Sequence, residues 1–208
     1  ECDWSSDVCS SDLAKGSGRV PHDVAAAVRW YRMAAEQGDP EACFALGVAT
    51  YNGIGVKQDH AEAAIWYRKA ADKGHAPGQY NLAHAYLDGA GVPQDEAEAA
   101  QLFRKAAEQG YPEAQLHFGR SLQFGTGVRQ DEAEAVKWVR KAADSGLVDA
   151  QSHLGFVYSL GRGVPQDHVE AVKWWRLAAE RGNPGALDRK STRLNSSHIP
   201  LSRMPSSA

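Results

Sequence analysis

The stretch Gly53-Ile54-Gly55-Val56-Lys57-Gln58-Asp59 returns three more times along the chain, in the pattern Gly-x-Gly-Val-x-Gln-Asp. The copies begin at Gly89, Gly125 and Gly161, so the step is always 36 residues. A fixed period of this size is typical of a solenoid, in which each unit is too small to bury its own apolar face and stacks on its neighbours. The sequence therefore predicts a repeat protein.

Each unit contains the patterns of two helices. The first helix is predicted by apolar residues at spacings of three and four, such as Ala42, Leu46 and Ala49. The second helix begins with a capping acid three residues before a glutamate, as in Asp59 and Glu62, which is the capping-box pattern. A glycine ends it, since glycine adopts the left-handed C′ conformation without strain. We therefore predict an all-α fold, a right-handed α-solenoid of helix-turn-helix repeats.

Two further recurrences predict how the helices pack. Gly47, Gly119 and Gly155 lie beside the apolar stripe of the first helix, where glycine costs helix stability. We therefore expect a neighbouring helix to approach closely there. Large rings alternate with alanine pairs in the second helix, and we assign the tryptophans of this row to helix packing rather than to a ligand platform. The row consists of Trp30, Trp66, Trp138 and Trp174.

The repeat register divides the chain into a solenoid and two flanking segments. The solenoid is predicted to span residues 14–187, with a partial unit at 14–38, full units at 39–74, 75–110, 111–146 and 147–182, and a truncated unit at 183–187. Residues 1–13 and 188–208 fall outside the register and are rich in serine. We interpret both as non-native or disordered tails, and their composition resembles translated sequencing-adapter read-through.

The composition excludes several classes of protein. The chain has 208 residues and a net charge of −3, and its Lys and Arg residues are spread through every repeat beside Asp and Glu. No basic surface for nucleic acid is therefore predicted. No apolar run approaches the ~20 residues that span a bilayer. Cys43 is the only cysteine within the predicted solenoid, so no disulfide is expected inside it. The compartment stays open between cytoplasm and periplasm or secretion, because we expect the native N-terminus to be missing.

The repeated motif resembles a known family. It reads Ala-x3-Leu-Gly, then Gly-x-Gly-Val-x-Gln-Asp, then Ala-x2-Trp-Tyr-x-Lys-Ala-Ala-x2-Gly, and is similar to the Sel-1-like repeat, a relative of the tetratricopeptide repeat. The resemblance covers residues 20–187. It implies a non-catalytic scaffold that binds a partner protein or peptide in a concave groove, within a bacterial signalling, envelope or host-interaction assembly.

In tetratricopeptide folds a stripe of the first helix lines the concave groove, and the resemblance implies the same stripe here. The predicted partner-binding residues are Tyr80, Asn81, His84, Asp88, His117, Arg120, Phe124, His153 and Phe156. Asn81, His117 and His153 occupy the same position in successive repeats, so we expect them to form one row. His84 and Arg120 are related in the same way, so we expect them to lie side by side. We expect Asn81 to bind the ligand backbone and Arg120 to bind a carboxylate.

Neither a metal site nor an active site is predicted. The histidines form no His-Glu-x-x-His motif, and the Gly-x-Gly loops lie between two helices, whereas phosphate-binding loops follow a strand. No Ser-x-x-Lys or Gly-x-Ser-x-Gly motif occurs, so we expect no enzyme activity and no cofactor. Two alternatives stay open. One is a β-lactam or peptidoglycan hydrolase, which the resemblance to cysteine-rich relatives implies, and the other is a structural spacer without a groove ligand.

The C-terminal end of the solenoid is predicted to be uncovered. A solenoid needs polar capping units at its ends. The truncated unit leaves Trp174, Trp175 and Ala178 without most of the helix that should cover them. We therefore expect self-association through this end.

Overall fold

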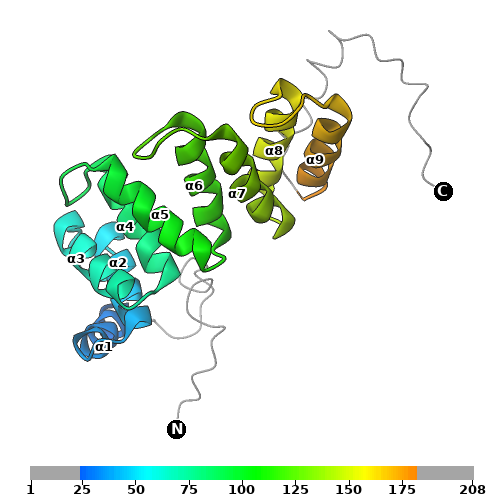
Figure 1. Cartoon of the computed structure of the whole chain (residues 1–208). Coiled ribbons are helices and arrows are strands. Elements are labelled where there is room, and N and C mark those ends of the chain that lie inside the picture. Colours follow the sequence, from blue (N-terminus) through cyan, green and yellow to red (C-terminus); the bar gives the residue numbers. More distant parts are fainter. Residues whose placement is uncertain (1–23, 182–208) are drawn as a thin grey trace.

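The fold is an array of helix pairs (Figure 1). A computed structural model describes residues 24–181, which form nine helices of 13 residues each. The first helices of the repeats are α2 (Pro40–Asn52), α4 (Ala76–Asp88), α6 (Pro112–Phe124) and α8 (Val148–Leu160). The second helices are α1 (Val24–Glu36), α3 (His60–Asp72), α5 (Glu96–Glu108), α7 (Glu132–Asp144) and α9 (His168–Glu180). The predicted all-α solenoid is confirmed.

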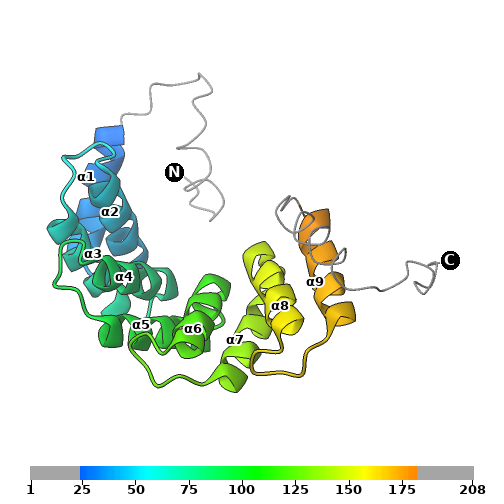
Figure 2. The same ribbon diagram turned by 90° about the horizontal axis from the view of Figure 1, so that it is seen from above.

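The helix pairs stack into a curved array. Seen from above, the array bends through an arc from α1 to α9, and α2, α4, α6 and α8 lie along its inner side (Figure 2). The first helices therefore form the concave side of the array, and the second helices form its outer side. None of the helices between residues 24 and 181 is long and apolar enough to cross a membrane.

An aspartate begins each second helix from α3 onward. In α7 the Asp131 carboxylate accepts a hydrogen bond from the Glu134 N–H at 2.9 Å, as the capping pattern predicts. The glutamate half of the capping box is wrong, because the Asp131 N–H already donates to the Leu122 carbonyl at 2.9 Å. The Glu134 carboxylate instead binds the Lys137 ammonium at 2.9 Å. The aspartate thus fixes the helix start and also ties it to the preceding helix.

The Gly-x-Gly-Val-x-Gln-Asp motif forms the loop between the two helices of a repeat. Its first glycine ends the first helix in the left-handed conformation, as at Gly125 with φ of 73°. Its glutamine closes the loop, since the Gln130 side chain donates to the Gln123 carbonyl at 2.9 Å. At the second glycine, Gly127, a Cβ would lie 1.9 Å from the Glu96 carbonyl oxygen. The loops at Gly91, Gly127 and Gly163 therefore pack on the second helix of the preceding repeat at a distance that only glycine permits.

The recurring glycines of the first helices face the second helix of the same repeat. A Cβ at Gly155 would lie 2.4 Å from the indole nitrogen of Trp175, and a Cβ at Gly47 would lie 2.7 Å from the Tyr67 ring. The predicted close approach is confirmed, and its partner is a large ring at Gly47 and Gly155 and the Val139 side chain at Gly119. The Trp175 indole N–H also donates to the Ser152 carbonyl at 3.1 Å, which joins α9 to α8.

The tryptophan row packs against the preceding repeat. Trp66 is buried between α3 and α1, where the Arg32 guanidinium lies 5.9 Å from its ring and the Glu62 carboxylate accepts its N–H at 3.2 Å. Trp30 occupies the same repeat position but is 67% exposed. The packing assignment is therefore wrong for Trp30, because no helix of the described part precedes α1.

The C-terminal end differs from the prediction. Trp175 and Ala178 are buried, because they pack against α8. Trp174, the third residue of that prediction, is half-buried, and self-association through this end stays a prediction. The predicted truncated unit at 183–187 and the predicted tails at 1–13 and 188–208 lie outside the described residues.

We expect replacement of Gly127 by alanine to destabilise the fold far more than replacement of Gly110. Both glycines have positive φ, 69° and 89°, so alanine costs about 1 kcal/mol of backbone strain at either position. A Cβ meets no atom within 4 Å at Gly110 but overlaps the Glu96 carbonyl at Gly127. Urea unfolding followed by circular dichroism should show at least about 2 kcal/mol of additional loss for Gly127→Ala. Equal losses in the two variants would contradict the close contact.

Candidate functional site

We call the inward-facing side of α4, α6 and α8 the concave surface (Figure 2). All nine predicted partner-binding residues lie on these three helices. Helix α4 carries Tyr80, Asn81, His84 and Asp88, helix α6 carries His117, Arg120 and Phe124, and helix α8 carries His153 and Phe156. Spacings of three and four residues within each helix bring these side chains to one side.

Five rings pack together where α4, α5 and α6 meet, and we call them the ring cluster. The His84 and His117 ring centroids are 4.7 Å apart. Tyr80 lies 4.7 Å from His84 and 5.5 Å from His117. Phe103 of α5 stacks on His117 at 5.1 Å, and Tyr111 lies 5.3 Å from Tyr80. Edge-to-face and stacked contacts at these distances are favourable, so the ring cluster holds α4 against α6.

His117 contacts two rings of α4. They are Tyr80 and His84, which lie 37 and 33 residues earlier in the chain, on either side of Asn81. The row of Asn81, His117 and His153 stays a prediction. Arg120 lies one turn from His117 on α6 and adds to the positive potential at that ring.

Two of the predicted binding residues have partners inside the solenoid. The Asn81 side chain hydrogen-bonds to the Tyr67 hydroxyl. His153 Nε2 lies 2.8 Å from Gln123 Oε1, which joins α8 to α6. These contacts hold Asn81 and His153 in place and occupy part of their capacity to bind a ligand.

Sequence reasoning missed three residues that support the concave surface: Phe103, Tyr111 and Gln123. Phe103 occupies the repeat position of Tyr67 and Trp175, so its burial could be predicted, but its contact with His117 could not. Gln123 is buried and lies outside the predicted stripe. Its side chain contacts His153 of the next repeat.

Three of the predicted residues are exposed, namely Asp88, Arg120 and Phe124. Phe124 is a large apolar side chain at the end of α6 and is 58% exposed. Arg120 forms no ion pair with any residue between 24 and 181. The concave surface therefore presents a positive charge and an aromatic ring, four residues apart on α6, to solvent.

Burial keeps both histidines of the ring cluster neutral at pH 7. Burial lowers the pKa of His117 to about 4, and the positive charges of His84 and Arg120 act in the same direction. Burial also lowers the pKa of His84, against the opposing attraction of Asp88. Each neutral imidazole offers one donor and one acceptor.

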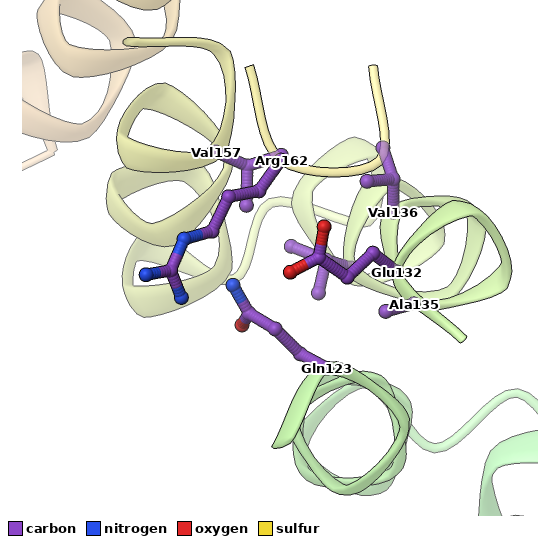
Figure 3. A pocket seen from close by; sticks show the side chains of 7 residues that line it. Gln123, Glu132, Ala135, Val136, Val157 and Arg162 are labelled. Carbon is purple, nitrogen blue, oxygen red and sulfur yellow. The ribbon is translucent and has the colours of Figure 1, made fainter. Parts of the chain in front are cut away.

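Other features of the described part do not form a deep site. A small pocket between α6, α7 and the loop after α8 is lined by Gln123, Glu132, Ala135, Val136, Val139, Val157 and Arg162 (Figure 3). No group of three His, Cys, Asp or Glu side chains in residues 24–181 could hold a metal ion. The Cys43 thiol is buried, and burial raises its pKa, which opposes formation of a nucleophilic thiolate.

Acidification is expected to destabilise the protein through His117. A histidine whose pKa is lower in the folded state binds more protons when unfolded, so its contribution to stability is present above about pH 6.5 and is lost as the pH falls toward 4. The lowering from 6.5 to about 4 predicts a loss of about 2 kcal/mol in the free energy of unfolding between pH 7 and pH 4.5.

Urea unfolding at these two pH values measures this effect. The pH dependence should shrink by that amount in His117→Gln and should stay unchanged in His168→Gln, a control at an exposed position in the first turn of α9. The burial of His117 would be contradicted if both variants kept the full pH dependence.

Comparison with protein families identifies the repeats. A model described as the Sel1 repeat matches residues 13–39, 40–75, 76–111, 112–147 and 148–183. The comparison with curated proteins gives no match.

Solved structures agree with this assignment. A protective antigen of uropathogenic Escherichia coli that displays an SLR fold has a TM-score of 0.79 and 40% identity, with 85% of this chain and 38% of the antigen covered. A Sel1 repeat protein from Oxalobacter formigenes has a TM-score of 0.76 and 33% identity, with 86% and 73% covered. An immunity protein from Pseudomonas aeruginosa has a TM-score of 0.54 and 28% identity, with 84% and 63% covered. The chain thus spans less than half of the E. coli antigen. With five matched repeats and these structural similarities, it belongs to the Sel1 repeat family.

Proposed function

We propose that the protein is a non-catalytic scaffold that binds a segment of a partner protein on its concave surface. The observation that carries this proposal is the exposure of Phe124 beside Arg120. Phe124 is 58% exposed, and Arg120 has no ion pair within the described part of the chain. Aromatic and arginine side chains contribute most strongly to binding at protein interfaces, and exposed apolar groups mark such sites.

The architecture supports a protein ligand rather than a small molecule. Repeats contact only their neighbours, so the array offers a long curved surface without a single deep pocket. The rings of His84, His117 and Phe103 already hold one another in place before a partner arrives. A preformed surface loses less conformational entropy on binding, which favours affinity.

The relatives support a role in bacterial protein interactions. One similar structure is a protective antigen of uropathogenic E. coli, and another is an immunity protein of P. aeruginosa. By this similarity we propose that the chain acts in a bacterial signalling, envelope or host-interaction assembly. The partner would be a protein or peptide rather than a nucleic acid, because cations and acids are interspersed within every repeat.

No observation in the described residues favours a hydrolase. The Thr50, Ser145 and Ser159 hydroxyls donate to backbone carbonyls at 2.7, 2.7 and 2.8 Å. The Cys43 thiol is buried with a raised pKa. A structural spacer stays as the alternative outcome of the binding experiment.

The double variant Arg120→Ala and Phe124→Ala should lose partner capture. The full chain would serve as bait in an affinity pull-down from a lysate of the source organism. Loss of two central contacts worth about 1 kcal/mol or more each should lower the captured amount at least about tenfold.

The matched control is Arg129→Ala with Val169→Ala, which removes an exposed arginine and an exposed apolar side chain away from the concave surface. This control should capture the partner as the wild type does. Equal capture by both double variants would mean that binding lies elsewhere, and absence of any captured protein would favour the spacer.

A further inference from the structure

We infer that the partner segment is extended and carries an acidic side chain and an apolar or aromatic side chain two positions apart, which contact Arg120 and Phe124. This inference rests on the proposed function and names the chemistry of the partner. It follows from a division of the concave surface into two layers. The side chains of the inner layer contact one another within the solenoid, and those of the outer layer, Arg120 and Phe124, are open to solvent.

The inner layer is engaged within the solenoid. The rings of Tyr80, His84 and His117 contact one another at 4.7 to 5.5 Å. Asn81 hydrogen-bonds to the Tyr67 hydroxyl. These side chains support the surface and give it shape, so recognition of the partner depends chiefly on the outer layer.

The positive charge of the outer layer is complemented by an acidic group of the partner. The Arg120 guanidinium is exposed, and no carboxylate of residues 24–181 lies within ion-pair distance of it. Glu113 precedes it by seven residues, about 10 Å along α6. A carboxylate matches the planar fork of a guanidinium with two parallel hydrogen bonds, so an aspartate or glutamate of the partner is the complementary side chain.

The apolar part of the outer layer fixes the spacing. Phe124 follows Arg120 by four residues, so the two side chains lie on the same side of α6, about 6 Å apart along the helix axis. In an extended segment, side chains two positions apart point to the same side and are separated by about 6.5 Å. An acidic residue and an apolar residue in the order acid-x-apolar or apolar-x-acid therefore reach both contacts together.

The neighbouring charges favour a single carboxylate over a polyanion. Asp88 lies at the end of α4 and is exposed, so a run of phosphates crossing from α6 toward α4 would meet a negative charge. A peptide with one acidic side chain avoids this repulsion. The same surface therefore selects a short protein motif.

Selection from a phage-displayed library of random 12-residue peptides tests this inference on the full chain. The enriched peptides should contain Asp or Glu two positions from Phe, Trp, Leu, Ile or Met. Selection on Arg120→Glu should replace the acidic residue by Lys or Arg. Phe124→Ser should weaken the binding of the enriched peptides at least about tenfold in fluorescence polarisation.

Two matched variants control for the change of charge and the change of polarity at a surface. Arg129→Glu lies in an exposed loop position, and Val169→Ser replaces a side chain that is 63% exposed on α9. Both should bind the enriched peptides as the wild type does.

The outcomes separate this inference from the proposed function. Some peptides could lose binding to Phe124→Ser and yet carry no acidic residue, or bind Arg120→Glu as well as the wild type. Such peptides would overturn the inferred chemistry, but the concave surface would remain the binding site. Peptides that bind all variants equally, or a selection that enriches none, would overturn both.

Discussion

The rest of the structure depends on one contact, between the loop of each repeat and the second helix of the preceding repeat. At Gly127 the loop backbone approaches the Glu96 carbonyl so closely that a side-chain carbon would not fit. The same approach recurs at Gly91 and Gly163. Because this contact repeats, each repeat is seated on its predecessor in the same way, and the regular seating produces the arc whose inner side is lined by the first helices (Figure 2).

The seated helices bring together the side chains of the concave surface. The rings of His84 and His117 pack against each other and against Phe103 of α5. These rings support the surface. Arg120 and Phe124 lie beside them and are exposed to solvent. The loop contacts thus seat the helices that carry these two side chains, through which we propose that a partner is recognised.

The fold was predictable because local signals repeat in register. The capping role of Asp131 and the close approach at Gly155 both follow from residue chemistry at a fixed period. The contacts between neighbouring first helices were not predictable, since they arise from packing and have no sequence motif, as the ring contact of His117 with His84 shows. Exposure also depends on neighbours, and Trp30 is therefore exposed at a position where Trp66 is buried.

Site-specific photo-crosslinking tests the central claim most directly. A photoreactive phenylalanine analogue would replace Phe124 on the concave surface or Val169 on α9, two apolar side chains of similar exposure, 58% and 63%. After irradiation in a lysate of the source organism, we predict a discrete cross-linked protein from position 124 and none from position 169. Cross-linking of the same protein from position 169 alone, or equally from both positions, would contradict recognition on the concave surface.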